Sequence, residues 1–231
     1  MTAEDLRKSI LQQAIQGKLV PQDPNDEPAS VLLERIREEK NRLIKEKKIK
    51  KDKNESIIYR GEDNSYYEKI LATGEVKCID DEIPFEIPQS WEWCRLGQIF
   101  QHNTGKALNS SNTSGQLRKY LTTSNVYWNS FDFTTIKEMY FKDEELDKCS
   151  IKKGDLLVCE GGDIGRAAIW NKDETLCIQN HIHRLRAYFP ISTKYFYYIF
   201  YYIKNSNYKS SSLVSIWCEC RSNLQLSLKD D

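Results

Sequence analysis

The chain has 231 residues, and its 34 basic and 34 acidic side chains give a formal net charge of zero. This length allows one domain, or a small domain with an appendage, and is enough to bury a hydrophobic core. Charged residues make up 29% and aromatic residues 11% of the chain, which excludes an intrinsically disordered protein. No apolar run approaches the roughly 20 residues of a membrane span, and no hydrophobic signal core follows Met1. The seven cysteines include no C-x-x-C pair, so we expect a cytoplasmic protein with free thiols.

The neutral total conceals segments of opposite charge. Residues 45–53 carry a local charge of +4, residues 60–86 carry −5, and residues 102–209 carry +4. A basic body can meet the phosphates of a nucleic acid while an acidic connector stays away from them. A solvated surface explains so small an excess almost as well, so charge alone does not decide between the two.

Two amphipathic helices are predicted at the N-terminus. Apolar residues recur at helical spacing over residues 2–17, where Thr2 suits the N-cap and Gly17 the C-terminal stop. After a connector that contains prolines, a second helix is expected from Ala29 to about Ile49, with Pro28 near its first turn. Such helices need each other, the rest of the chain or a partner to cover their apolar faces.

Beyond these helices the pattern predicts an α+β fold with a strand-rich body. Residues 50–86 are polar, with tyrosines that suit a small hairpin, and a turn followed by a Trp-alternating strand is expected over 87–96. Further short strands are expected at 120–126, 136–141, 155–159, 167–170 and 177–186. A last helix is expected over Lys194–Ile203, whose aromatic side chains we interpret as core and not as a platform for stacking bases.

A glycine cluster at residues 160–166 allows two interpretations. Its backbone N–H groups would suit a phosphate, with Arg166 adding positive charge. The cluster lacks the Lys-Ser/Thr pair of a nucleotide-binding P-loop, and no helical pattern follows it. A plain hairpin turn with glycines at positive φ is therefore the favoured alternative.

The evidence for catalysis in the sequence is weak. His181 and His183 lie two apart on an expected strand, but two further ligands at suitable spacing are missing, so we expect no structural zinc. A nucleophilic pair of Cys159 or Cys177 with His181 remains open. The clustered carboxylates of a nuclease and the glycine-rich cofactor loop of an amino-methyltransferase are both missing, so catalysis is the weaker class.

The remaining polar residues suit recognition of a nucleic acid. Guanidinium, amide and hydroxyl groups are the types that contact base edges and phosphates, and side chains that carry them recur here on loops and strand ends. The candidates for DNA contact are Lys106, Arg118, Lys119, Thr122, Ser124, Asn125, Arg166, Gln179, Asn180 and His181, with Thr123 and Arg184 as further polar neighbours.

Several stretches of the chain resemble one known family, the specificity (S) subunits of type I restriction–modification systems. Their conserved N-terminal block is similar to LRKSILQQAIQGKLVPQDPNDEPASVLLERIREEKNRLIKEKKIKK, and the entry to their target recognition domain is similar to CIDDEIPFEIPQSWEWCRLGQI. Two more degenerate strand motifs of the family resemble GDLLVCEGGDIGRAAIW and IQNHIHRLRA. The resemblance covers about residues 4–205, and its first two blocks are long and specific.

This resemblance implies a non-catalytic subunit that reads double-stranded DNA. It would direct adenine methylation and cleavage by a methyltransferase (M) subunit, held by the helices, and a restriction (R) subunit. S-adenosylmethionine, ATP and Mg would be bound by those partners, so no cofactor is expected in this chain. The implied organisation is a helical block over 1–52, an acidic polar connector over 53–86, a target recognition domain over 87–205 and an atypical tail over 206–231.

The tail departs from the family pattern. A complete S subunit looks like two recognition domains separated by long conserved helices, and the usual Pro-Pro strand and E-Q-x-R-I helix are absent from residues 206–231. A truncated or frameshifted subunit, or a half-subunit that pairs with a second copy of itself, would explain this departure. The alternatives are a non-functional remnant, a protein-interaction module and, less favoured, a Cys-dependent hydrolase.

Overall fold

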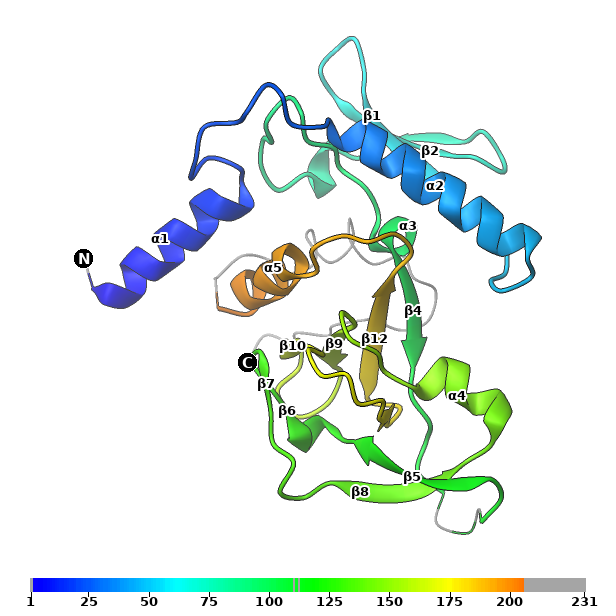
Figure 1. Ribbon diagram of the computed structural model, residues 1–231. Helices are drawn as coiled ribbons and strands as arrows, with labels where there is room; N and C mark the ends of the chain where they lie inside the picture. Colours follow the sequence, from blue (N-terminus) through cyan, green and yellow to red (C-terminus); the bar gives the residue numbers. More distant parts are fainter. Residues whose placement is uncertain (1, 110, 112, 206–231) are drawn as a thin grey trace. The chain divides into compact units, whose positions relative to one another are not determined.

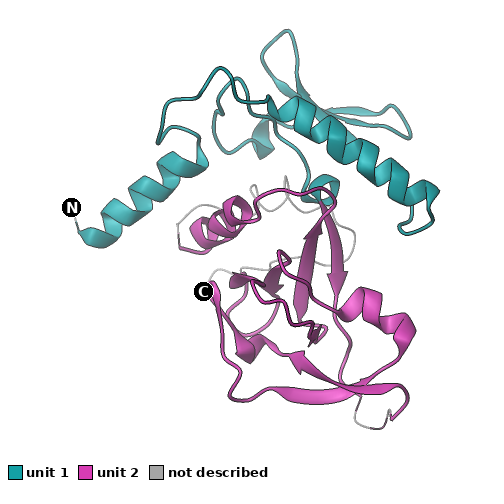
Figure 2. Cartoon of the chain, in the orientation of Figure 1, with its two compact units in different colours: residues 1–99, 206–223 teal, residues 100–205, 224–231 magenta. Residues whose placement is uncertain are grey.

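The computed structural model describes residues 2–109, 111 and 113–205, which form two compact units (Figures 1 and 2). Unit 1 ends at Ile99 and unit 2 begins at Phe100, so the division falls later than the expected domain start at residue 87. Helices and sheets are both present, which confirms the predicted α+β class. The predicted tail over 206–231 lies outside the described residues. No helix in the described part of the chain has the length and apolar character needed to cross a membrane.

The first helix of unit 1, α1 (Ala3–Ile15), has the ends that its sequence predicts. Thr2 is the N-cap: its hydroxyl accepts from the backbone N–H of Asp5, whose carboxylate accepts in return from the N–H of Thr2. Gly17 takes a φ of +68° just beyond the helix, where the next N–H reaches back to the carbonyl of Gln13. This is the Schellman arrangement, for which glycine is the favoured residue.

The second helix, α2 (Ala29–Lys45), is shorter than expected. Pro28 is its N-cap and contributes no side-chain hydrogen bond. The helix ends before Ile49 because Lys47 takes the left-handed conformation, with a φ of +56°, and the N–H of Lys48 bonds back to the carbonyl of Leu43. The stop therefore has the same geometry as that of α1, with lysine in place of glycine.

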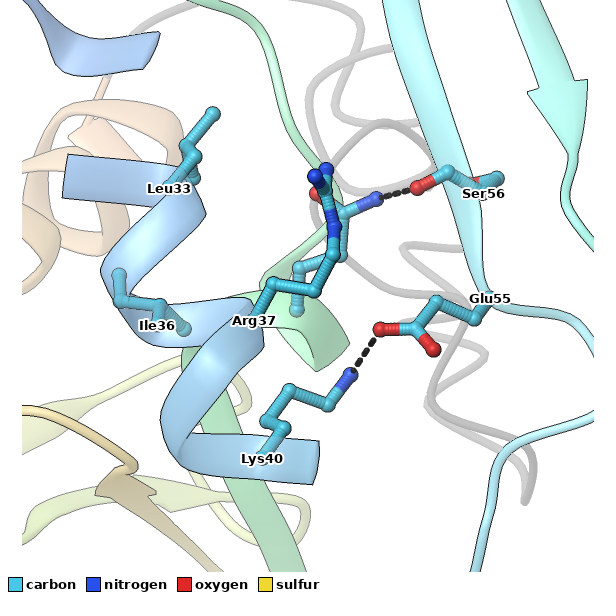
Figure 3. A pocket seen from close by; sticks show the side chains of 7 residues that line it. Leu33, Ile36, Arg37, Lys40, Glu55 and Ser56 are labelled. Carbon is cyan, nitrogen blue, oxygen red and sulfur yellow. Dashed lines mark hydrogen bonds and ion pairs between the residues drawn. The ribbon is translucent and has the colours of Figure 1, made fainter. Parts of the chain in front are cut away.

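The stretch expected as an acidic connector contains a three-stranded antiparallel sheet. Strands β1 (Ser56–Arg60) and β2 (Tyr66–Ile70) form the predicted hairpin, β3 (Val76–Cys78) pairs with β2, and the 3-10 turn η1 (Asp80–Glu82) follows. In Figure 3 the amine of Lys40, on α2, points at the carboxylate of Glu55 next to this sheet, and the two are 3.1 Å apart. The pocket around them has a volume of about 10 Å³, about the room that one water molecule needs. It is therefore part of the packing of unit 1.

The prediction of a Trp-alternating strand over 87–96 is wrong. The segment has no strand, and it leads into the short helix α3 (Leu96–Ile99). Trp93, Cys94 and Arg95 are all buried in succession, whereas a half-buried strand would expose every second side chain. The segment instead packs as an irregular strip, in which the carbonyl of Ser90 accepts from the backbone N–H of Ala29 at the start of α2.

Unit 2 is built around an antiparallel four-stranded sheet in the order β10-β9-β12-β4. Its strands are β4 (Phe100–Thr104), β9 (Leu156–Cys159), β10 (Ala167–Ile169) and β12 (Ile182–Ala187). Every residue of β9 is apolar and buried, as expected for a central strand covered on both faces. Helix α5 (Lys194–Asn205) contacts β10 and buries Phe196, Ile199 and Phe200. This buried face confirms the interpretation of the aromatic helix as core.

A second sheet and several turns complete unit 2. Strand β5 (Gln116–Leu121) pairs antiparallel with β8 (Lys137–Phe141) and parallel with the short β11 (Cys177–Ile178). The remaining elements are the 3-10 turn η2 (Thr123–Asn125), the small hairpin β6 (Val126–Tyr127) and β7 (Ser130–Phe131), and helix α4 (Asp143–Cys149). Phe131 and Phe133 pack edge to face against fully buried Trp170 in one hydrophobic cluster, and Tyr120, Phe141, Cys149 and Cys177 form a second cluster between β5, β8, β11 and α4.

The expected strands of unit 2 are confirmed where the pattern is local and apolar. β8, β9 and β10 match the strands expected at 136–141, 155–159 and 167–170. The strand expected at 120–126 ends at Leu121 and turns into η2. The one expected at 177–186 is broken between β11 and β12, because the backbone N–H of Asn180 pairs with the carbonyl of Lys106.

Candidate nucleic-acid interface

Three turns of unit 2 meet where strands β5, β9 and β11 end; we call them the polar rim, residues 122–125, 160–166 and 179–181. The N–H of Gln179 donates to the carbonyl of Leu121 at 2.9 Å, and that of Glu160 to the carbonyl of His181 at 3.0 Å. The guanidinium of Arg166 donates to the carbonyl of Thr123 at 2.6 Å. The structure therefore brings together Thr122, Ser124, Asn125, Arg166, Gln179, Asn180 and His181 from the predicted set.

Close approach of two backbones positions the third turn of the rim. A Cβ atom built on Gly105 would lie 2.0 Å from the carbonyl oxygen of Ile178, so no other residue fits there. The next residue, Lys106, then bonds by its N–H to the carbonyl of Ile178 and by its carbonyl to the N–H of Asn180. These contacts hold the backbone of residues 179–181, while the His181 side chain stays exposed.

Two residues of the rim are buried and form hydrogen bonds within the protein. Asn125 is fully buried: its Oδ1 accepts from the N–H of Thr122 at 2.8 Å, and its Nδ2 donates to the carbonyl of Asp132 at 3.0 Å. Thr122 is buried and its hydroxyl bonds to the same Asn125 oxygen. Both side chains shape the 3-10 turn, so their predicted contact with DNA is corrected to a structural role. Ser124, at the tip of this turn, is exposed.

The predicted DNA contact of Lys106 is also corrected. Its amine donates to Glu145 Oε2 at 2.6 Å and to the carbonyl of Tyr140 at 2.9 Å, and lies 5.4 Å from the ring centre of Phe141. The hydrogen bond from Lys106 lowers the pKa of the Glu145 carboxyl group. Because the Lys106 side chain is only 12% exposed, it joins helix α4 to strand β8 and is not available to a phosphate.

Arg118 and Lys119 lie outside the rim, on strand β5 that leads into it. Arg118 is partly buried, stands opposite Met139 and donates to the side chain of Gln116 at 2.7 Å. Lys119 is exposed and stands opposite Glu138 on the neighbouring strand. Of the two, Lys119 has the freer side chain for contact with a phosphate.

The glycine cluster forms the predicted hairpin turn between β9 and β10. Gly162 and Gly165 take φ angles of +72° and +83°, which glycine adopts without strain. Arg166 follows the turn, and its guanidinium lies 5.0 Å from the ring centre of Tyr127. The cation thus fastens this turn to the β6 hairpin and remains partly exposed.

The three histidines of the chain gather beside this turn, a grouping that sequence spacing did not reveal. His183, in β12, is buried, and its Nδ1 lies 2.7 Å from Nε2 of His102 in the neighbouring strand β4. On its other side, Nε2 of His183 lies 3.3 Å from Glu160 Oε2, which is 4.0 Å from Nδ1 of the exposed His181. Among the described residues no group of three or more His, Cys, Asp or Glu side chains is arranged to hold a metal ion. His181 lies in a turn and not on the expected strand.

Cys159, Cys177 and Arg184 are all buried. Burial raises the pKa of the Cys159 and Cys177 thiols to about 11, so both are protonated at neutral pH, unlike a nucleophilic cysteine. Arg184 is fully buried and donates to the carbonyls of Asp147 and Ser150 at 2.9 and 2.5 Å. It stabilises the end of helix α4, so a contact with DNA is excluded by its position.

Residues 88–216 match the model of the type I restriction modification DNA specificity domain. The chain belongs to this family. It is 47% identical over 109 residues to the specificity subunit of the type I restriction enzyme EcoAI from Escherichia coli, a match that covers 47% of this chain and 15% of that protein. It is 48% identical over 94 residues to the corresponding subunit of EcoEI from the same organism, covering 41% of this chain and 12% of the relative.

Two solved structures are less similar in sequence to this chain than these relatives. A structure from work on complex assembly and conformational transition of the type I R-M system aligns with a TM-score of 0.41 and 18% identity, covering 52% of this chain and 30% of that one. The HsdS subunit of Thermoanaerobacter tengcongensis aligns with a TM-score of 0.39 and 18% identity, covering 52% and 29%.

The specificity-domain match contains the whole polar rim. All three turns, the two central sheets of unit 2 and the histidine cluster lie within residues 88–216, whereas helices α1 and α2 precede the match. The polar side chains that this specificity domain leaves accessible at the rim include Ser124, Glu160, Arg166, Gln179, Asn180 and His181. They include donors, acceptors and one permanent cation, the mixture of groups that reading base edges requires.

Proposed function

We propose that this chain recognises a short sequence in double-stranded DNA as a specificity component of a type I restriction–modification complex. The match to the DNA specificity domain over residues 88–216 is the observation that carries the proposal. The polar rim supports it, because accessible amide, hydroxyl and imidazole groups converge there from three separate segments. The chain spans only a small part of the curated relatives it matches, so its role in a complete complex is part of this proposal.

The rim residues divide into two roles in this proposal. Gln179 and Asn180 have amides of the kind that pair with adenine, and Ser124 adds a hydroxyl that can bond to either base pair. His181 adds an exposed imidazole. Lys119, on the strand that enters the rim, is exposed and would contact a phosphate and fix the register of the protein on the duplex. Arg166 would add positive charge beside the glycine turn.

Helices α1 and α2 are proposed to bind methyltransferase (M) subunits. Leu6 and Ile10 of α1 are 49% and 45% exposed, so this helix presents apolar surface that a partner helix would cover. The chain itself would be non-catalytic. Adenine methylation with S-adenosylmethionine would belong to the M subunits, and ATP- and Mg-dependent cleavage to a restriction (R) subunit. With a second copy, the chain would form a two-fold symmetric dimer that recognises a split palindromic DNA sequence.

The decisive experiment expresses the chain together with the M subunit encoded in the same genome and maps adenine methylation. We expect one short or split motif to be methylated only when the chain is present. A Gln179→Ala/Asn180→Ala variant should change or abolish that motif, while a Lys172→Ala variant, outside the rim, should leave it unchanged. A chain that binds the M subunit but directs no motif would be an interaction module, and the proposal would be wrong.

A further inference from the structure

Glu160 is a carboxylate in a surface that we propose to face DNA. It follows directly after β9 and precedes Gly161 and Gly162, and its side chain is 40% exposed. The other carboxylate of this turn, Asp163, is 2.8 Å from the amine of Lys204 and is balanced by it. Glu160 instead faces histidines, so its negative charge near phosphates needs another explanation.

His102 and His183 bring no positive charge to Glu160. Burial lowers the pKa of His102 and of His183 to about 4, so both rings are neutral at pH 7. If Nε2 of His102 donates to Nδ1 of His183, the proton of His183 is on Nε2 and faces the carboxylate. The opposite tautomer would direct a lone pair at the negative charge, so the first is favoured. His183 therefore presents an N–H group, and no positive charge, to the carboxylate of Glu160.

The carboxylate of Glu160 can still accept hydrogen bonds from a ligand despite its contact with His183. The distance of 3.3 Å from His183 Nε2 to Glu160 Oε2 is short, but Nε2 is buried and has no partner of hydrogen-bond geometry. An ionised carboxylate has about four acceptor positions, most of which thus remain open to a ligand. Next to it the chain is open: Gly162 is exposed, and a Cβ built there would meet no atom within 4 Å.

We propose that Glu160 selects a cytosine by accepting a hydrogen bond from its N4 amino group in the major groove. This inference rests on the proposed DNA-reading function. Cytosine is the one base whose major-groove edge presents a donor without an adjacent acceptor. Guanine and thymine present acceptors that repel a carboxylate, and adenine places its N7 acceptor beside its amino group. The charge of Glu160 thus favours one base by attraction and disfavours the other three.

The test selects bound duplexes from a random library with the purified chain, in complex with its M subunit where that is needed for binding. We expect the wild-type motif to contain a position restricted to cytosine. Glu160→Gln, which keeps the size of the side chain and removes its charge, should reduce the preference at that position by between about fivefold and about a hundredfold. Glu160→Ala should relax the same position, and all other positions should stay as they are.

The matched control is Glu174→Gln, which makes the same change of charge at an exposed residue. The backbone carbonyl of Glu174 accepts from the indole N–H of Trp170, and the backbone N–H of Trp170 donates to the carbonyl of Asp155, which precedes β9 at the end opposite Glu160. This variant should select the wild-type motif. Thermal unfolding of each variant shows that the comparison is made between folded proteins.

The outcomes separate this inference from the function on which it rests. A wild-type motif that Glu160→Gln and Glu160→Ala both leave unchanged overturns the role of Glu160 but keeps DNA reading. An equal rise in affinity for all duplexes in Glu160→Gln and Glu174→Gln shows an effect of net charge alone and also overturns it. A wild-type chain that selects no motif overturns the proposed function, and the inference with it.

Discussion

The imidazoles of His102 and His183 meet edge to edge, with the ring planes 17° apart and Nε2 of His102 2.7 Å from Nδ1 of His183. The pair joins β4, the edge strand of the four-stranded sheet, to β12. Burial, with the neighbouring His183 as a second cause for His102, lowers the pKa of both rings to about 4. One shared proton thus links the strands, and protonation of either ring would place a charge in a buried site.

The first prediction is that acid destabilises unit 2 through this pair. In the unfolded chain each histidine has an ordinary pKa of 6.5, so below that pH the unfolded state binds more protons than the folded state. The free energy of unfolding should therefore fall as pH drops from 6.5 towards 4. Each histidine should account for about 2 kcal/mol between pH 7 and pH 5. Urea unfolding at the two pH values measures the difference.

The control for this prediction compares histidines inside and outside the pair. A His102→Gln/His183→Gln variant should lose much of the dependence on pH, although its stability at pH 7 will also change. His181→Gln, at an exposed ring, should keep the wild-type dependence. The same loss of stability between pH 7 and pH 5 in the double variant and in the wild type would contradict the assignment.

The second prediction separates the two lysines that the sequence proposed for DNA. Lys106→Met should lower stability by about 1 to 3 kcal/mol, because it removes the charged hydrogen bonds to Glu145 and to the carbonyl of Tyr140. Lys119→Met should leave stability unchanged, weaken duplex binding and reduce the slope of log K against log salt by about 1. Chemical unfolding and salt titrations of binding measure both effects. The assignment fails if Lys106→Met changes the salt slope without a loss of stability.

Helix ends and local strands could be predicted from the sequence, because the residues that decide them are close together. Thr2 and Gly17 limit α1 by contacts within a few positions, and the apolar run of β9 is explained by its own composition. The segment 90–96 and the break at 179–181 depend on distant partners. Ser90 binds the start of α2, and Asn180 binds Lys106, so no local pattern could show either.

The candidate site could be predicted only as a set of residue types. Asn125 and Lys106 have the chemistry of DNA-contacting residues, but their hydrogen-bond partners are inside the protein. Sequence alone does not distinguish an amide that bonds a base from one that closes a turn. His102 was missed for a related reason, since it is 81 positions from His183 and meets it only because β4 pairs with β12.

The third prediction concerns the end of α2. Lys47 holds a φ of +56°, a conformation that costs about 1 kcal/mol for a residue with a Cβ atom and nearly nothing for glycine. Lys47→Gly should therefore raise the free energy of unfolding of the chain by up to about 1 kcal/mol, measured by urea denaturation. Lys48→Gly, one position on, where φ is not positive, should lower it or leave it unchanged. Equal effects at the two positions would show that the left-handed turn is not the cause.

The last prediction concerns the ion pairs of unit 1. Arg95 is 7% exposed and donates to both oxygens of Glu68 and, at 2.9 Å, to Glu82. Glu68 is 9% exposed and also accepts from the hydroxyl of Ser56 at 2.5 Å. Arg95→Met would leave a buried carboxylate without its cation and should cost about 3 to 5 kcal/mol of stability in urea unfolding.

The reason for that cost can be tested by a second substitution at the same site. If the unpaired charge is the cause, adding Glu68→Gln to Arg95→Met should restore part of the lost stability, because the neutral amide costs less to bury. Arg42→Met removes contacts to Glu39 and Glu46 at the surface, where the arginine side chain is 58% exposed, and should have little effect. Equal losses for Arg95→Met and Arg42→Met would show that burial does not distinguish these ion pairs. Equal losses for the single Arg95 variant and the double variant would indicate that lost packing, and not the charge of Glu68, sets the cost.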